Sequence, residues 1–196
     1  MKTMKTNFLK IAIVLFLGLM SVNCSKDEDT IVYPEQNPLD LYLSESGFDQ
    51  AKVDVINSSD YEFGLSFKPT VKGKINAIVA KIPDAQAGMR VTIWETTTKT
   101  ILRTELVDVA TAGVAVTKEI TPLELDKDKE YTITYNGNDW YNRKKTDNSV
   151  VVYPFTAGDI QITGYGYASG ALQVYPTAFP MNYYAGDVSF KFQRTE

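Results

Sequence analysis

Apolar and polar residues alternate along most of the chain from Tyr61 onward. In the first such run, Phe63, Leu65 and Phe67 alternate with small or polar residues, which is the period of two expected of a strand with one face on a core. The pattern recurs at short intervals, and turn-forming residues bound each run. The predicted strands are residues 61–67, 75–82, 90–95, 101–107, 114–120, 130–135, 149–153, 160–167, 172–175 and 188–193.

The spacing of these strands indicates an all-β fold. No long segment with the helical period of 3.6 follows the N-terminal leader, and the connections are too short for the crossovers that parallel strands require. We therefore predict an antiparallel β-sandwich, of the jelly-roll or immunoglobulin-like type, that occupies residues 39–196 as a single domain. Residues 39–57 leave two alternatives open: one or two early strands, or a short helix around residues 49–53.

The first 23 residues have the layout of an export signal. Lys2, Lys5 and Lys10 make a basic start, residues 11–20 form an apolar run, and a lone cysteine, Cys24, follows shortly afterwards. The apolar run is too short to cross a bilayer, which takes about 20 apolar residues. We predict that residues 1–23 are a cleaved signal peptide. The alternative to a lipoprotein signal is an ordinary secretory leader without a lipid on Cys24. It would leave an odd free thiol in an exported protein, which is unfavourable.

The residues around Cys24 resemble the lipobox of bacterial lipoproteins, with Ser21 where that motif usually has Leu or Val. Residues 25–29, SKDED, are similar to the surface-export signal of lipoproteins from the Bacteroidota. The resemblance implies a lipid on Cys24, a flexible tether over residues 24–38, and a place in the outer membrane facing the cell exterior. Acyl chains at one terminus anchor a protein without a transmembrane element, because each buried CH₂ contributes about 0.8 kcal/mol.

The charge of the chain argues against nucleic acid as a partner. The sequence has 20 Lys and Arg against 24 Asp and Glu, and three of the lysines precede Cys24, so the mature part carries a net charge of −7. Binding to a polyanion requires clustered basic residues. The compact basic group at residues 143–145 is interpreted as a solvated loop.

The residues that the chain lacks narrow its chemistry. It has no histidine, which excludes Ser-His-Asp and Cys-His catalysis and histidine-ligated zinc. The single cysteine is assigned to the lipid anchor. We therefore predict no catalytic residues, no resident metal and no cofactor. Hydrolysis by a pair of carboxylates stays a remote alternative, because such a pair is defined by its separation in space.

Several segments together resemble a bacterial β-sandwich domain of unknown function. They are residues 61–67, 73–78, 88–94, 101–102, 122–125 and 129–135, and the resemblance covers about residues 61–142. Residues 112–115 depart from it, since that family tends to have Gly-Trp there. The domain is found in secreted and surface proteins, often beside carbohydrate-active modules. The resemblance thus implies an extracellular role but no catalytic residues.

Aromatic residues provide the candidate binding sites. Asn138, Asp139, Trp140 and Tyr141 lie in a polar, turn-forming segment after a predicted strand, where binding residues are often found. Trp140 would stack on a sugar ring while Asn138 and Asp139 form hydrogen bonds. Two alternatives stay open: Trp140 folds back over the end of the sandwich, or Asn138 and Asp139 help to ligate a structural calcium ion.

A second candidate surface contains Tyr165 and Tyr167, which point to the same side of a predicted strand. Gly166 between them permits close approach of a ligand or of another backbone. Residues 179–184 are a third candidate, with core packing as the alternative. Trp94, Tyr131 and Tyr135 are expected in the core.

These features favour a non-catalytic extracellular binding module for a glycan or a similar ligand. An accessory lipoprotein that docks to another outer-membrane protein is the main alternative, because the same aromatic residues suit a protein interface.

Overall fold

The fold was examined in a computed structural model, which describes residues 31–196. The predicted signal peptide at residues 1–23 and the lipidation site Cys24 lie outside the described residues. Residues Val32–Glu196 form one compact unit built of one helix and twelve strands. No helix in this described part is long and apolar enough to cross a membrane.

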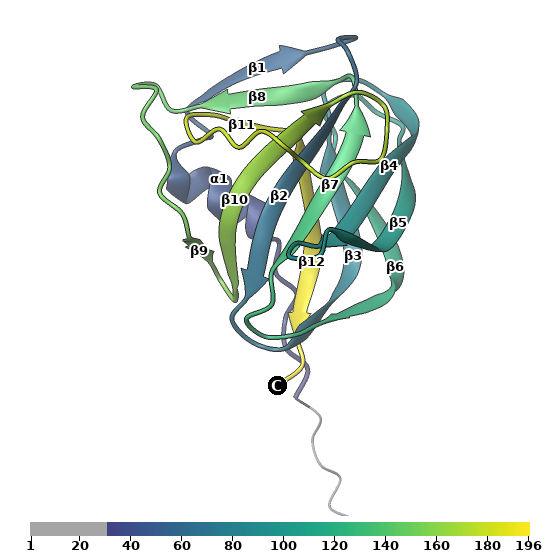
Figure 1. The fold of residues 1–196 in the computed structure, drawn as a ribbon, viewed down its shortest axis with the longest axis vertical. Helices are drawn as coiled ribbons and strands as arrows, with labels where there is room; N and C mark the ends of the chain where they lie inside the picture. Colours follow the sequence, from purple (N-terminus) through teal and green to yellow (C-terminus); the bar gives the residue numbers. More distant parts are fainter. Residues whose placement is uncertain (1–30) are drawn as a thin grey trace, which may run out of the picture. The chain divides into compact units, whose positions relative to one another are not determined.

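The largest layer is an antiparallel sheet of six strands (Figure 1). Its strand order is β5 (Thr100–Val109), β4 (Gln86–Glu95), β7 (Tyr131–Gly137), β2 (Tyr61–Pro69), β10 (Ile160–Ser169) and β9 (Phe155–Ala157). Alternate residues of β2 face the core, and Phe63, Leu65 and Phe67 are each at most 3% exposed. The period of two in the sequence thus reflects the face of β2 that packs on the core between the sheets, as expected of a sandwich; on the other face Glu62 and Gly64 are buried as well.

A second antiparallel sheet packs against the inner face of the first. It consists of β12 (Asp187–Arg194), β3 (Gly73–Lys81) and β6 (Val116–Leu125). The rings of Phe67 and Phe190 lie 4.3 Å apart across the two sheets. Helix α1 (Pro38–Ser46) contacts β12 and β9 and buries Leu39 and Tyr42 in the same core.

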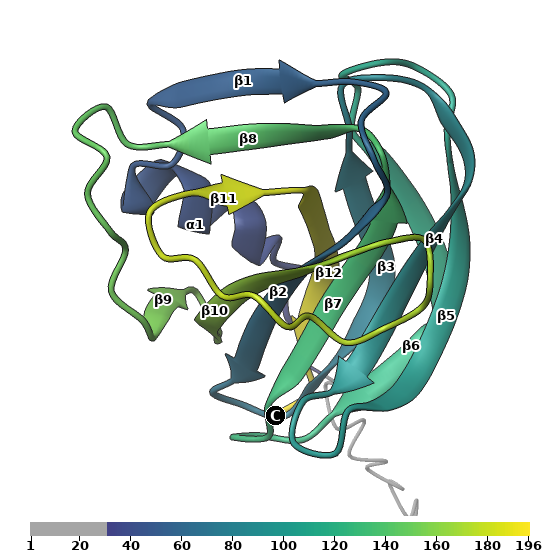
Figure 2. The same ribbon diagram turned by 45° about the horizontal axis from the view of Figure 1, so that its top comes forward.

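A third, smaller sheet lies across one end of the sandwich (Figures 1 and 2). It contains β1 (Ala51–Val55), β8 (Trp140–Lys144) and β11 (Tyr184–Ala185), again antiparallel. β8 leaves β7 after two linking residues and turns away from the six-stranded sheet. Residues at the ends of β2 and β10 therefore come to face the side chains of β8.

A long connection between β10 and β11 covers the outer face of the six-stranded sheet (Figure 2). We call this connection, residues 170–183, the strap. Gln173 donates hydrogen bonds to Thr92 and Thr104, and Tyr175 shares one with Thr132. Pro176 lies close to the Cα of Gly64, where a Cβ atom would be only 3.1 Å from its ring. The strap is thus held down by contacts along its length.

The predicted all-β class and antiparallel sandwich are confirmed, although three sheets rather than two are present. Two predicted strands are wrong. Residues 149–153 form no strand. Residues 172–175 belong to the strap, where side chains supply the hydrogen bonds to the sheet, and the backbone of the strap pairs with β10 only further on, at Ala178. For residues 39–57 the sequence left a strand or a short helix open, and the structure contains both. The strand is β1, and the helix lies at Pro38–Ser46 rather than at residues 49–53.

The last residues of the predicted tether, 24–38, contact the sandwich. Gln36 exchanges two backbone hydrogen bonds with Phe192 of β12, at 2.8 and 2.9 Å. Pro38 is buried and begins α1, a position where its missing N–H costs nothing. The last residues of the predicted tether therefore belong to the folded domain.

Candidate ligand-binding pocket

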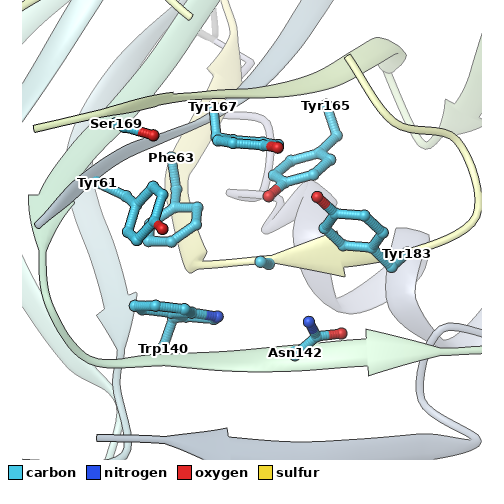
Figure 3. Close-up of a pocket in the computed structure, with 9 residues that line it drawn as sticks. Tyr61, Phe63, Trp140, Asn142, Tyr165, Tyr167, Ser169 and Tyr183 are labelled. Carbon is cyan, nitrogen blue, oxygen red and sulfur yellow. The ribbon is translucent and has the colours of Figure 1, made fainter. Parts of the chain in front are cut away.

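A pocket of about 210 Å³ opens where the small third sheet meets the end of the six-stranded sheet (Figure 3). β8 contributes Trp140 and Asn142, and β10 contributes Tyr165, Tyr167 and Ser169. The remaining lining residues are Tyr61, Phe63, Tyr183 and Ala185. Six of the nine are aromatic, so most of the wall is made of ring faces and edges. We call this site the aromatic pocket.

Trp140 forms one side of the aromatic pocket and is half-buried. Its ring lies 4.9 Å from Phe63 and 5.3 Å from Tyr61, the latter in an edge-to-face arrangement. Trp140 therefore covers the end of the sandwich and lines the pocket at the same time. The alternative in which Trp140 folds back over the end of the sandwich agrees with these contacts, and stacking of a sugar on the ring stays a prediction.

The predicted display of Tyr141 on a loop is wrong. β7 continues to Gly137 and β8 begins at Trp140, so only two residues link them. Because neighbouring residues of a strand point to opposite faces, Tyr141 points away from the aromatic pocket and is 2% exposed. The ammonium of Lys52 lies 3.9 Å from the centre of its ring. Tyr141 is thus part of the packing beneath β1.

Asn138 and Asp139 also lie outside the aromatic pocket. The Asp139 carboxylate is buried and accepts a hydrogen bond of 2.6 Å from the backbone N–H of Asn57. The carbonyl of Asn138 accepts another, of 3.0 Å, from Ser58. These bonds fix the β1–β2 connection. Over residues 31–196 no group of three acidic side chains is placed to hold a metal ion.

Tyr165 and Tyr167 both line the aromatic pocket, as their spacing in the sequence suggested. Tyr165 is 1% exposed and forms the inner wall, while Tyr167 is half-buried nearer the opening. Gly166 faces the other way. A Cβ at that position would lie 2.7 Å from the ring of Phe179, so the glycine makes room for the strap and not for a ligand.

Two polar atoms at the aromatic pocket are buried without a hydrogen-bond partner. They are the hydroxyl of Tyr165 and the side-chain oxygen of Asn142. In folded proteins nearly all buried polar atoms are paired, and an unpaired one costs about 1–3 kcal/mol. Burial raises the pKa of Tyr165 well above its ordinary value, so the hydroxyl keeps its proton and can donate it to a hydrogen bond. The aromatic pocket therefore offers one donor and one acceptor to a ligand.

Tyr183 adds a further hydroxyl at the opening. Burial, together with the neighbouring Tyr167, raises the pKa of Tyr183 to about 12, so it too is protonated at neutral pH. The rings of Tyr165 and Tyr183 are neighbours, with centroids 5.8 Å apart, and Figure 3 shows both hydroxyls pointing into the aromatic pocket. In the candidate segment 179–184, Tyr184 is fully buried while Phe179 is 58% exposed, so only Tyr183 serves the pocket.

No charged side chain lines the aromatic pocket. Arg143 follows Asn142 in β8 and points to the opposite face, where its Nε lies 2.8 Å from the carboxylate of Asp187. Both residues are buried, so the interpretation of residues 143–145 as a solvated loop is wrong for Arg143. The charge of Arg143 is therefore paired on the face of β8 opposite the aromatic pocket, and the lining of the pocket is uncharged.

A family model described as "Domain of unknown function (DUF4082)" matches residues 49–185, well over half of the chain. The chain belongs to this family. A search of curated proteins found no match. The DUF4082 match begins just before β1 and ends with β11, so every residue that lines the aromatic pocket lies inside it. Helix α1 precedes the range matched by the DUF4082 model and strand β12 follows it, and both pack in the same sandwich.

Four lining residues of the aromatic pocket in the DUF4082 domain were candidates from the sequence, namely Trp140, Tyr165, Tyr167 and, within the segment 179–184, Tyr183; the other five were missed. Asn142 could have been found by alternation, because it follows Trp140 by two residues and shares its face of β8. Tyr61 and Phe63 carried no comparable signal. Their place in the aromatic pocket depends on how β8 crosses the end of the larger sheet.

Proposed function

We propose that this chain is a lipoprotein of the outer membrane whose DUF4082 domain is a non-catalytic module that binds a neutral glycan or a similar extracellular ligand. The proposed site is the aromatic pocket. The observation that carries the proposal is the pair of unpartnered polar atoms, on Tyr165 and Asn142, inside a wall of aromatic rings.

Sugar rings suit this chemistry. A pyranose has apolar C–H faces that stack on aromatic rings and hydroxyl edges that both donate and accept hydrogen bonds. One hydroxyl would accept from Tyr165 while another donates to the oxygen of Asn142. The absence of charge among the nine lining residues favours a neutral sugar. It also leaves the aromatic pocket without a carboxylate, which supports binding without hydrolysis.

The position of the aromatic pocket suits a domain anchored through its N-terminus. Ala185 lines the pocket just before β12 begins, and Gln36 pairs with Phe192 near the other end of that strand. Phe192 follows Ala185 by seven residues, most of them in β12, so these two points lie roughly 20 Å apart. The chain thus comes into the domain at the end away from the aromatic pocket, which leaves the pocket free for ligands in the medium.

The lipid anchor rests on the sequence around Cys24. Mass spectrometry of the native membrane protein should find a diacylglyceryl group on an N-terminal Cys24, and Cys24→Ser should release the protein from the membrane fraction. An unmodified thiol on the exported chain would refute the anchor. It would leave the binding proposal standing.

Tryptophan fluorescence offers a direct test of the binding site, because the chain has two tryptophans in different places. Trp140 lines the aromatic pocket, whereas Trp94 is buried on the strap side of the sheet, with its Nε1 donating to Thr134 at 2.9 Å. Titration with neutral oligosaccharides should change the emission of wild type and of Trp94→Phe. The change should vanish in Trp140→Phe. A response that persists without Trp140 would contradict the assignment.

The alternative role, docking to another outer-membrane protein, has its own supporting observation. Val150, Val152, Phe179 and Met181 are 44–75% exposed. Their segments lie side by side, because the N–H of Val151 donates to the carbonyl of Met181 at 2.9 Å. An exposed apolar patch of this kind is typical of a protein interface. Purification from the native envelope should then recover a stoichiometric partner that is lost in Val152→Ser.

A further inference from the structure

Strand β1 carries its valines on one face, with Val53 exposed and Val55 half-buried, and its charges on the opposite face. Val53 is 62% exposed, and its strand lies at the edge of the third sheet. The residues on either side, Lys52 and Asp54, form an ion pair of 3.2 Å next to the ring of Tyr141. A register shifted by one residue would exchange the two faces. The observed register thus places an apolar face outside.

This apolar face continues directly into the aromatic pocket. In the pairing of β1 with β8, Val55 lies opposite Trp140 and Val53 opposite Asn142. Opposite residues of an antiparallel pair share one face of the sheet. A groove of about 270 Å³ runs over this face, lined by Ala51, Val53, Val55, Asn142 and Lys144. We call it the valine groove, and Asn142 is common to it and to the aromatic pocket.

We infer that the ligand is amphipathic, an uncharged ring in the aromatic pocket that carries a short apolar substituent in the valine groove. The inference rests on the proposed function and specifies its ligand class as a sugar with an alkyl, acyl or aryl group. Asn142 stands at the junction of the two sites, where its side-chain oxygen lacks a partner. A ring hydroxyl beside the substituent would donate to this oxygen.

The chemistry of the valine groove agrees with such a substituent. None of its five lining residues is acidic, and the single cation, Lys144, contributes a long methylene stem beside its charge. Transfer of a methylene from water into an apolar site is favourable by about 0.8 kcal/mol, which is nearly a fourfold gain in affinity. Two buried methylenes should therefore strengthen binding more than tenfold.

The test compares methyl and octyl glycosides of glucose, galactose, mannose and N-acetylglucosamine, below the concentrations at which the octyl compounds form micelles. Calorimetry on the wild-type domain should show that the octyl form of the preferred sugar binds more than tenfold tighter than its methyl form. In Val53→Ser this gain should fall severalfold, while the affinity for the methyl glycoside stays unchanged.

Leu106→Ser is the matched control, because Leu106 is a similarly exposed apolar residue, 59% exposed, on the edge strand β5 of the other sheet. It should leave both affinities unchanged. The inference would be overturned if the octyl glycoside bound no more tightly than the methyl glycoside, or if its tighter binding survived Val53→Ser. Binding of the methyl glycoside would in that case still uphold the proposed function. Failure of every methyl glycoside to bind would instead count against the proposed function.

A second copy of the chain is the competing occupant of the valine groove. Sedimentation of the wild-type domain without ligand should show a monomer at micromolar concentration. A dimer that dissociates in Val53→Ser would mean that the groove is a self-association surface, and it would overturn the inference.

Discussion

Removal of one hydroxyl should separate the stability of this domain from its ligand binding. The hydroxyl of Tyr165 is buried without a partner, so Tyr165→Phe removes an unsatisfied polar group and keeps the ring in place. Burial of an unpaired hydroxyl costs about 1–3 kcal/mol. We expect the variant to be about 1 kcal/mol more stable than wild type without ligand. Ligand affinity should fall about two- to tenfold, as for the loss of one hydrogen bond.

Urea unfolding followed by tryptophan fluorescence measures the first effect. With an m-value of about 2 kcal/mol/M, a gain of 1 kcal/mol moves the midpoint upward by about 0.5 M. Tyr135→Phe is the control, because the hydroxyl of Tyr135 is also buried but donates to the carbonyl of Asp139 at 3.0 Å. That variant should lose about 1–2 kcal/mol. Equal destabilisation in both variants would refute the reasoning, since it would mean that the hydroxyl of Tyr165 is already paired.

Three further substitutions test other parts of the structure. Asp187→Asn removes the partner of a buried guanidinium, and we expect a loss of about 3–5 kcal/mol in urea unfolding; a loss below 1 kcal/mol would contradict the buried ion pair. Burial raises the pKa of Glu62 above its ordinary 4.5, so the folded chain holds this proton more tightly and stability falls as the pH rises through and above 4.5. Glu62→Gln should flatten that fall in unfolding curves recorded at several pH values, and an unchanged slope would argue against it. Gly186→Ala places a Cβ 2.6 Å from the ring of Tyr135 at a φ of +85°, which should cost about 2–4 kcal/mol; a thermal midpoint equal to that of wild type would show that the backbone can move aside.

The central strands of the sandwich were predictable because burial on one face imposes a simple period. In β2 the apolar residues alternate, whereas β3 ends in the continuous apolar run 77–80, and the predicted bounds of both strands fall within two residues of the observed ones. Residues 149–153 and 172–175 show that apolar runs do not always form strands. The second of these runs lies in the strap and contacts the sheet through side-chain hydrogen bonds, while the backbone bridge between strap and sheet forms only at Ala178, opposite Tyr167.

Helix α1 was misplaced because its signals lie at its ends and not in its periodicity. Pro38 occupies the first turn, and Gly47 ends the helix in the left-handed region with a φ of +82°. Both residues are visible in the sequence. The apolar face between them is short, with Leu39 and Tyr42 as its main buried residues, so the pattern alone did not distinguish helix from strand.

The aromatic pocket was only partly predictable, for a reason of geometry. The sequence indicates which residues share a face of one strand, as it did for Tyr165 and Tyr167. It does not indicate that β8 crosses the end of the larger sheet and brings Trp140 against Phe63. Tyr141 was misassigned because the extent of β8 decides which of two adjacent rings turns inward.

The strap has a consequence for how occupancy of the domain can be read. Its two ends emerge from the aromatic pocket, since Ser169 precedes it and Tyr183 closes it. A molecule held between these two residues would bind only while the strap is in place, so its binding energy must also oppose detachment of residues 170–183. Slower cleavage of this segment by a protease would thus report the capture of such a molecule, without any label or chemical assay.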